Sequence, residues 1–304
     1  MTTAVLVMAY GTPRRHDEIE AYYTDIRRGR PPTPEQLAAL VRRYDAIGGL
    51  SPLAERTQAQ CAGLQRALDE RAPDLFEVVL GLKHATPTIE TAVDDLATRG
   101  RRDVVGLVLA PHHSALSVGQ YLDRARTAAA RHDITVHGID SWHLEPAYLD
   151  FLAAGVRRQL ATVPDGSKVV FTAHSLPARS VEAGDAYPEQ LRATATAVAE
   201  RVGLGHWSRW GVAWQSAGRT PEPWLGPDIL TVIDDLAASE GATGLVVCAA
   251  GFVSDHLEVL YDLDIEAKQR ASAHGLAFAR TACVNDDPTV LAALAERVID
   301  ASKG

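Results

Sequence analysis

Short apolar runs alternate with amphipathic stretches along most of this chain. The segment Ala4–Ala9 is continuously apolar, whereas Pro34–Ile47 spaces its apolar residues at helical intervals. Continuous apolar runs of this length are typical of strands buried on both faces, and amphipathic stretches are typical of the helices that cover them. The pattern therefore predicts an α/β protein built on parallel sheets.

The predicted elements form two successive sets of similar length. Strands are expected at Ala4–Ala9, Phe76–Gly81, Val104–Ala110, Ile134–Ile139, Lys168–Thr172, Trp210–Gln215, Leu245–Ala249 and Ala277–Thr281. Helices are expected at Pro34–Ile47, Leu53–Ala72, Thr88–Arg99, Val118–Arg131, Glu145–Leu160, Pro188–Val202, Ile229–Ser239 and Pro288–Ala301. We interpret the two sets as two Rossmann-like, doubly wound lobes that face each other across a cleft, each with a parallel four-stranded sheet. Residues 1–145 would form the N-terminal lobe and residues 146–304 the C-terminal lobe, with the helix through Glu145–Leu160 crossing between them.

Unusual polar residues follow the predicted strands. Tyr10 follows the first strand, His84 the second, His112 the third and His174 the first strand of the second set. Ligands of such folds bind outside the carboxyl ends of the strands, so we expect these residues to line the functional rim. His112 and His113 are adjacent, so their side chains diverge in an extended segment, which favours a structural or supporting role for the pair.

An acidic stretch after the strand Leu245–Ala249 is the most informative part of the chain. Glu258, Asp262 and Glu266 lie four residues apart, so an α-helix would stack three carboxylates along one face. Like charges at this spacing destabilise a helix, and a column of oxygen ligands for a cation would explain them. An acidic surface stripe near a helix N-terminus explains them equally well.

The sequence lacks the motifs of nucleotide-binding proteins and of serine hydrolases. There is no GxGxxG and no GxxxxGK[ST], so dinucleotide and P-loop sites have no phosphate cradle. Ser175 is not in a GxSxG nucleophile elbow. His174, by contrast, ends a predicted strand, where a neutral imidazole can accept a proton or bind a metal.

Composition narrows the class of protein. The chain has 304 residues, of which 46% are hydrophobic, and a net charge of −9, which disfavours general binding to nucleic acid. No apolar run is long enough to span a membrane, and the N-terminus has no signal-peptide pattern. The three cysteines, which are Cys61, Cys248 and Cys283, are far apart and too few for a four-thiolate iron–sulfur cluster. We therefore expect a reduced cytoplasmic protein.

Several segments together resemble the ferrochelatases, most closely the soluble coproporphyrin ferrochelatases of Gram-positive bacteria. The similarity runs nearly end to end and is carried by residues 7–13 (VMAYGTP), 48–53 (GGLSPL), 81–84 (GLKH), 172–177 (TAHSLP), 214–228 (WQSAGRTPEPWLGPD) and 251–266 (GFVSDHLEVLYDLDIE). This resemblance implies one chelatase-type unit of two Rossmann-like lobes. It implies a lyase that inserts ferrous iron into a tetrapyrrole.

The resemblance also implies roles for individual residues. His174 and Glu258 correspond to the family's catalytic pair, which removes pyrrole protons and passes the metal. Asp262 and Glu266 correspond to outer acidic residues that lead the metal or protons to the ring. Tyr10 corresponds to a tyrosine that approaches the metal from the opposite side of the macrocycle.

The remaining site residues are expected to bind the porphyrin. Some of these residues match porphyrin-binding positions of the family, and others are cations that could bind the four propionates of coproporphyrin III. The residues are Tyr10, Arg27, Arg28, Arg43, Ser51, Lys83, His84, Tyr121, Ser216 and Trp224. Each arginine alone is equally compatible with an ordinary surface residue. The polar segment from Arg14 to Pro32 occupies the place of the apolar lip of membrane-associated protoporphyrin enzymes, which favours the more soluble substrate.

We therefore expect a coproporphyrin ferrochelatase of haem biosynthesis, with coproporphyrin III and Fe²⁺ as its partners. No cofactor beyond the substrate Fe²⁺, no iron–sulfur cluster, no nucleic acid and no membrane insertion are expected. We expect a monomer with at most transient contacts to neighbouring haem-pathway enzymes. The alternatives are a protoporphyrin IX ferrochelatase, a cobalt or nickel chelatase, and a non-catalytic porphyrin-binding protein.

Overall fold

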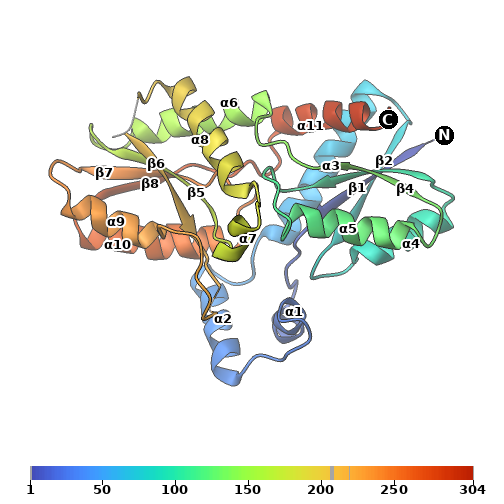
Figure 1. Cartoon of the computed structure of the whole chain (residues 1–304), viewed down its shortest axis with the longest axis horizontal. Coiled ribbons are helices and arrows are strands. Elements are labelled where there is room, and N and C mark those ends of the chain that lie inside the picture. The colour runs from blue at the N-terminus through green and yellow to red at the C-terminus, as the bar shows by residue number, and fades with distance from the viewer. Residues whose placement is uncertain (1, 206–208, 219, 304) are drawn as a thin grey trace. The chain divides into compact units, whose positions relative to one another are not determined.

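The chain forms two compact units in the computed structural model. The structure describes residues 2–205, 209–218 and 220–303. The first unit contains residues 1–110, 116–141 and 285–304, and the second contains residues 111–115 and 142–284. Each unit has one four-stranded parallel sheet with helices on both faces (Figure 1). The prediction of an α/β fold with two doubly wound sheets is therefore confirmed.

The sheet of the first unit has the strand order β2-β1-β3-β4. Its strands are β1 (Thr3–Ala9), β2 (Phe76–Leu82), β3 (Asp103–Val108) and β4 (Thr135–Ile139). The helical elements of this unit are η1 (His16–Glu18), α1 (Ile19–Ile26), α2 (Pro34–Ala46), α3 (Leu53–Arg71), α4 (Ile89–Thr98), α5 (Val118–Ala129) and α11 (Pro288–Ala301).

Alternation along β1 explains the two helical layers of the first unit. Leu6 and Met8 belong to a buried cluster with residues of α4 and α5, so these helices cover one face of the sheet. Val5 and Val7 are also fully buried and point to the opposite face, where α3 and α11 pack against each other and against the sheet (Figure 1). Strand β1 is therefore buried on both faces, as its continuous apolar sequence predicted.

The sheet of the second unit has the strand order β6-β5-β7-β8. Its strands are β5 (Lys168–His174), β6 (Trp210–Gln215), β7 (Gly244–Cys248) and β8 (Ala277–Arg280). The helical elements are α6 (Pro146–Leu160), α7 (Ala178–Glu182), α8 (Tyr187–Val202), α9 (Ile229–Ala238), the π-helix η2 (Val259–Ala267) and α10 (Lys268–Ala273). Helices α6 and α8 cover one face, and α9, η2 and α10 cover the other (Figure 1).

The division of the chain differs from the predicted boundary at residue 145. Helix α11 returns to the first unit and packs closely on α3, where a Cβ added at Gly63 would lie 2.5 Å from the Leu291 side chain. Helix α6, which we expected to cross between the lobes, packs within the second unit against α8, β7 and β8. Tertiary packing decides both points, and hydrophobic periodicity does not contain this information.

The loop of residues 111–115 follows β3 but is bound to the second unit. The His113 backbone N–H donates to Gln190 Oε1 (2.7 Å), and the Ser114 hydroxyl donates to Asp185 Oδ2 (2.7 Å). His112 is fully buried, and its Nε2 lies 2.9 Å from the Thr194 hydroxyl. The structure thus confirms the structural interpretation of this histidine pair.

No helix among the described residues is both long enough and apolar enough to cross a membrane.

Candidate active site

His174 and Glu258 form an ion pair in the second unit. His174 is the last residue of β5, and Glu258 lies just before η2, in the segment that follows β7. Because β5 and β7 are neighbouring parallel strands, their carboxyl ends bring the two side chains together. His174 Nε2 lies 3.7 Å from Glu258 Oε1, and about a third of each side chain is exposed, 36% and 34%.

The protonation of His174 follows from its two contacts. Its Nδ1 lies 2.5 Å from the carbonyl oxygen of Ser175, which can only accept, so Nδ1 carries a proton. Burial lowers the pKa of His174, but the Glu258 carboxylate outweighs burial and raises this pKa to about 9. The same interaction holds the pKa of Glu258 well below its ordinary value, against the opposing effect of burial. At neutral pH the pair is therefore imidazolium and carboxylate.

A second imidazole, that of His256, lies beside Glu258 and was not predicted from the sequence. His256 Nε2 lies 3.5 Å from Glu258 Oε2, and His256 Nδ1 lies 3.0 Å from the carbonyl of Ser254. Both oxygens of the carboxylate thus face a histidine. The available signal was a histidine two residues before the glutamate at a helix start, but that spacing alone does not place both rings on one carboxylate.

The predicted α-helical column of carboxylates is wrong in its geometry. Residues 259–267 form a π-helix, whose i→i+5 hydrogen bonds widen the turn and change which residues align. Asp262 is buried and accepts a hydrogen bond from the Ser216 hydroxyl, whereas Glu266 is exposed. Ser216, which we predicted to bind porphyrin, has φ +59° and contacts the acidic segment, and its porphyrin binding stays a prediction.

Like-charge repulsion in the acidic segment is relieved by individual partners. Arg280 holds Asp264 with two hydrogen bonds of 2.7 and 2.8 Å, and it lies 3.3 Å from Asp255. Glu258 has its histidines and Asp262 has its serine. A passing cation is therefore not required to explain why these acids are tolerated. Glu266 has no hydrogen bond or ion pair with any described residue, so it remains available to a cation from solvent.

Trp224, which we predicted to stack on the porphyrin, lies beside His174. The two ring centroids are 6.5 Å apart, and the Trp224 indole N–H donates to the Thr220 hydroxyl (2.9 Å). Gly218 lies directly under the indole, and a Cβ at this position would overlap the ring. The loop thus fixes the orientation of Trp224 next to the imidazole.

Two further residues contact the pair and were not anticipated. The buried Gln215 donates from Nε2 to the backbone carbonyl of Glu258 (3.3 Å). Tyr187 is buried on α8, and the Glu258 carboxylate adds to the effect of burial and Asp185 in raising its pKa above the ordinary range. Only the folded arrangement brings these residues to Glu258, because they are far from it in sequence.

The first unit carries a second group of predicted residues at the ends of β1 and β2. The Tyr10 ring is 41% exposed and lies 4.6 Å from the His84 ring. His84 Nδ1 lies 2.7 Å from Asp25 Oδ2. Burial lowers the pKa of His84 more than Asp25 raises it, so His84 is neutral at neutral pH.

Lys83 joins this group. Its ammonium donates to Gln120 Oε1 (2.7 Å) and lies 5.1 Å from the centre of the Tyr121 ring. Burial, and then Arg124 and Arg28, lower the pKa of Lys83 to about 8. The structure therefore brings Tyr10, Lys83, His84 and Tyr121 together, and porphyrin binding by them stays a prediction.

Arg124 was not anticipated and supports this group. It binds Glu90 through two hydrogen bonds of 2.7 Å, and it donates to the Lys83 backbone carbonyl (2.9 Å). Because its charge is already compensated by Glu90, Arg124 positions the lysine rather than offering a free cation.

The other predicted anion-binding residues have separate positions in the first unit. Arg27 and Arg28 follow α1, where the Arg27 guanidinium lies 5.5 Å from the centre of the Tyr23 ring. Arg28 is exposed, and its effect on the pKa of Lys83 places its charge near the group around that lysine. Arg43 lies on α2. The buried Ser51 hydroxyl accepts from the Leu53 backbone N–H (3.3 Å) at the start of α3. Porphyrin binding by these four residues stays a prediction.

Among residues 2–205, 209–218 and 220–303, no three or more His, Cys, Asp or Glu side chains are arranged to hold a metal ion. His174 and Glu258 offer two ligands, and His256 lies on the other side of the carboxylate. Two ligands suit a metal that must be passed on, because a complete ligand set would retain it.

Known proteins match this chain over nearly its whole length. A family model described as Ferrochelatase matches residues 2–302. A coproporphyrin III ferrochelatase of Geobacillus kaustophilus is 45% identical, over 98% of this chain and 95% of the relative. One of Halalkalibacterium halodurans is 43% identical, over 96% of this chain and 94% of the relative.

Solved structures with low sequence identity share the fold. SirB from Bacillus subtilis with Fe³⁺ has a TM-score of 0.61 and 14% identity, over 99% of this chain and 96% of that one. CbiX, a siroheme-biosynthesis enzyme of denitrifying bacteria, has a TM-score of 0.56 and 15% identity, over 98% of both chains. These similarities support the arrangement of two parallel sheets and carry no information on substrate.

Proposed function

The chain belongs to the ferrochelatase family, and we propose that it inserts Fe²⁺ into coproporphyrin III to form coprohaem in haem biosynthesis. The observation that carries the proposal is the His174–Glu258 pair at the ends of β5 and β7, in a chain that matches coproporphyrin III ferrochelatases over nearly its full length.

Insertion of the substrate metal must release the two pyrrole N–H protons of the porphyrin. A base that takes them has to be unprotonated when the ring arrives, yet His174 is an imidazolium while Glu258 is a free carboxylate. A divalent cation at the Glu258 carboxylate removes the electrostatic reason for that proton. His174 then releases its Nε2 proton to solvent, and the neutral Nε2 can accept a pyrrole proton.

The contact with the Ser175 carbonyl fixes the orientation of the His174 ring and the nitrogen that exchanges protons. Because Nδ1–H donates to the Ser175 carbonyl, the nitrogen that gains and loses protons is Nε2, which faces Glu258. His174 handles the pyrrole protons one at a time. Both protons end in solvent, and Asp262 and the exposed Glu266 are acidic residues of the segment that follows Glu258.

Recognition of propionates is the proposed role of the cations in the first unit. Lys83 is a half-buried ammonium that donates to the neutral amide of Gln120, and Arg27 and Arg28 follow the nearby end of α1. A propionate that binds Lys83 also supplies a counter-charge to this half-buried ammonium. A substrate with four propionates uses such cations better than one with two.

One assay tests the proposal against its alternatives. The protein is mixed without oxygen with coproporphyrin III or protoporphyrin IX and with Fe²⁺, Co²⁺ or Ni²⁺, and metallation is followed by absorbance. We expect the highest kcat/KM for Fe²⁺ with coproporphyrin III. Preference for protoporphyrin IX or for another metal would identify a different chelatase, and binding without metallation would identify a porphyrin-binding protein.

A further inference from the structure

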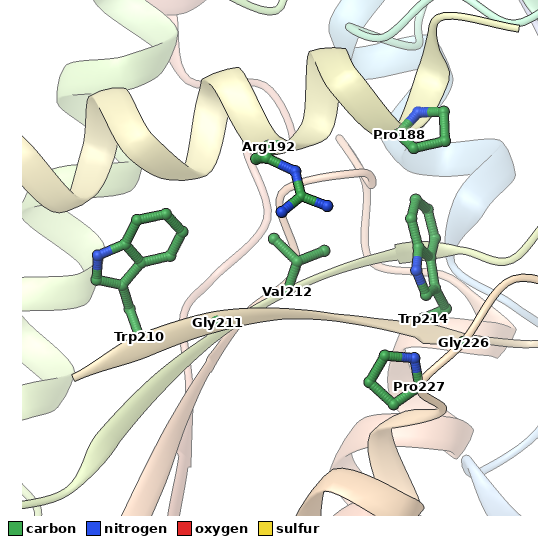
Figure 2. Close-up of a pocket in the computed structure, with 8 residues that line it drawn as sticks. All are labelled: Pro188, Arg192, Trp210, Gly211, Val212, Trp214, Gly226 and Pro227. Carbon is green, nitrogen blue, oxygen red and sulfur yellow. The ribbon is translucent and has the colours of Figure 1, made fainter. Parts of the chain in front are cut away.

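A pocket of about 520 Å³ lies along β6 in the second unit, between this strand and α8 (Figure 2). Arg192 enters it from α8, and the side chains of Trp210, Val212 and Trp214 enter it from β6. The turn at Pro227 closes one end. The pocket runs along the strand, whereas the proposed catalytic pair lies beyond the carboxyl ends of the strands.

The outer edge of β6 is open at Val212, as far as the described residues show. Strand β6 is the first of its sheet and pairs with β5, and its outer side carries an isolated bridge between Trp214 and Asp228. The carbonyl of Gln215 accepts from the Ser175 N–H and so faces β5, whereas the Trp214 N–H donates outward to the carbonyl of Pro227. Because backbone groups alternate along a strand, the N–H and C=O of Val212 also face outward. No described residue pairs with them.

Gly211 leaves β6 uncrowded beside this edge. It lies inside the strand, and a Cβ added there would meet nothing within 4 Å on the sheet face opposite the Val212 side chain. Glycine within a strand often marks a place where another chain approaches closely. An open edge of this kind is a template for an added strand, a recognised mode of peptide binding.

Arg192 gives the pocket its charge preference. It is exposed and forms no ion pair with any described acidic residue. The indole N–H of Trp210 already donates to the carbonyl of Gly205 (3.3 Å), so the ring offers the pocket its apolar surface. A guanidinium between two indoles suits a carboxylate carried on an apolar body.

We propose that this edge binds an extended acidic peptide segment of a partner protein. The segment adds to β6 as a strand at Trp210–Val212, with its main chain bonded to Val212. One of its apolar side chains packs between the indoles, and a Glu or Asp binds Arg192. A small carboxylate would use Arg192 alone and would leave the strand edge unpaired.

Fluorescence anisotropy of a labelled pentapeptide, acetyl-Thr-Val-Thr-Glu-Thr-amide, tests the proposal on the full chain, because its Val and Glu lie two residues apart and so on one face of an added strand. We expect saturable binding, weakened about tenfold by Arg192→Ala and about tenfold when Gln replaces Glu in the peptide. Val212→Pro removes the outward N–H without breaking a bond to β5, so it should also weaken binding about tenfold, whereas Val212→Thr should not.

A change in the peptide covers the case in which Val212→Pro fails to fold. N-methylation of the central residue removes a main-chain donor from the ligand, and we expect it to weaken binding to the unmodified protein about tenfold. Absence of binding up to ~5 mM peptide would overturn the proposal. Two other results would also overturn it: peptide binding that N-methylation leaves unchanged, or sodium benzoate that displaces the peptide at concentrations similar to those of the unlabelled peptide. Either result describes a site for small carboxylates.

Discussion

Replacing Glu258 with Gln should lower the pKa of His174 from about 9 toward its ordinary value of 6.5. The carboxylate is the group that overcomes burial, and the amide keeps the shape of the side chain while removing its charge. The net shift corresponds to ~3 kcal/mol if it is converted in full. Because about a third of each side chain is exposed, solvent screening reduces this to ~1–2 kcal/mol.

The pH dependence of stability has a defined direction. The pKa of His174 is raised on folding, so its contribution is complete below 6.5 and is lost as the pH rises through about 9. The pKa of Glu258 is lowered from 4.5, so its contribution is present above that value and is lost in acid. The free energy of unfolding of the wild-type protein should therefore exceed that of Glu258→Gln most between about pH 4.5 and 6.5.

Two measurements check this prediction. Titration of the histidine ring protons by NMR gives the pKa of His174 in both proteins, with His132, which pairs with Asp94 in the first unit, as the internal reference. Urea unfolding at several pH values gives the stability difference. An unchanged pKa of His174 in Glu258→Gln would refute the electrostatic account of the pair, and a stability difference that grows toward pH 9 would refute the linkage.

Three further predictions concern other parts of the chain. The charge of Lys83 is lost as the pH rises through about 8, so equilibrium titration should show coproporphyrin binding weakening above that pH, and Lys83→Arg should remove the dependence. His112 is buried and neutral with its pKa lowered to about 3, so stability should fall as the pH drops below 6.5. Urea unfolding of His112→Phe should show this acid slope reduced by up to ~1.4 kcal/mol per pH unit, and an unchanged slope would contradict the assignment. Gly218→Ala should displace the Trp224 ring, changing tryptophan fluorescence and weakening porphyrin binding, and normal binding would show that this indole does not contact the substrate.

Hydrophobic patterning predicted the sheets well. All eight strands lie where continuous apolar runs occur, with ends that shift by one or two residues. The short helices α1 and α7 were missed, because segments of eight and five residues show little periodicity. The π-helix was also missed, since the sequence of residues 259–267 is equally compatible with α-helical turns.

The site was predictable where a residue follows a strand. His174, Tyr10 and His84 have this signal, and the structure places them at strand ends. His256 and Arg124 lacked a signal of their own, because their contacts depend on side-chain directions in the folded unit.

Metallation by His174→Ala is the most direct test of the proposed function. Fe²⁺ insertion into coproporphyrin III is followed without oxygen, and binding of the free porphyrin is measured separately, with His132→Ala as the matched control. We expect a loss of kcat of at least ~100-fold for His174→Ala with porphyrin binding nearly unchanged, and wild-type values for His132→Ala. Normal turnover by His174→Ala would contradict the assignment of His174 as the base that removes the pyrrole protons.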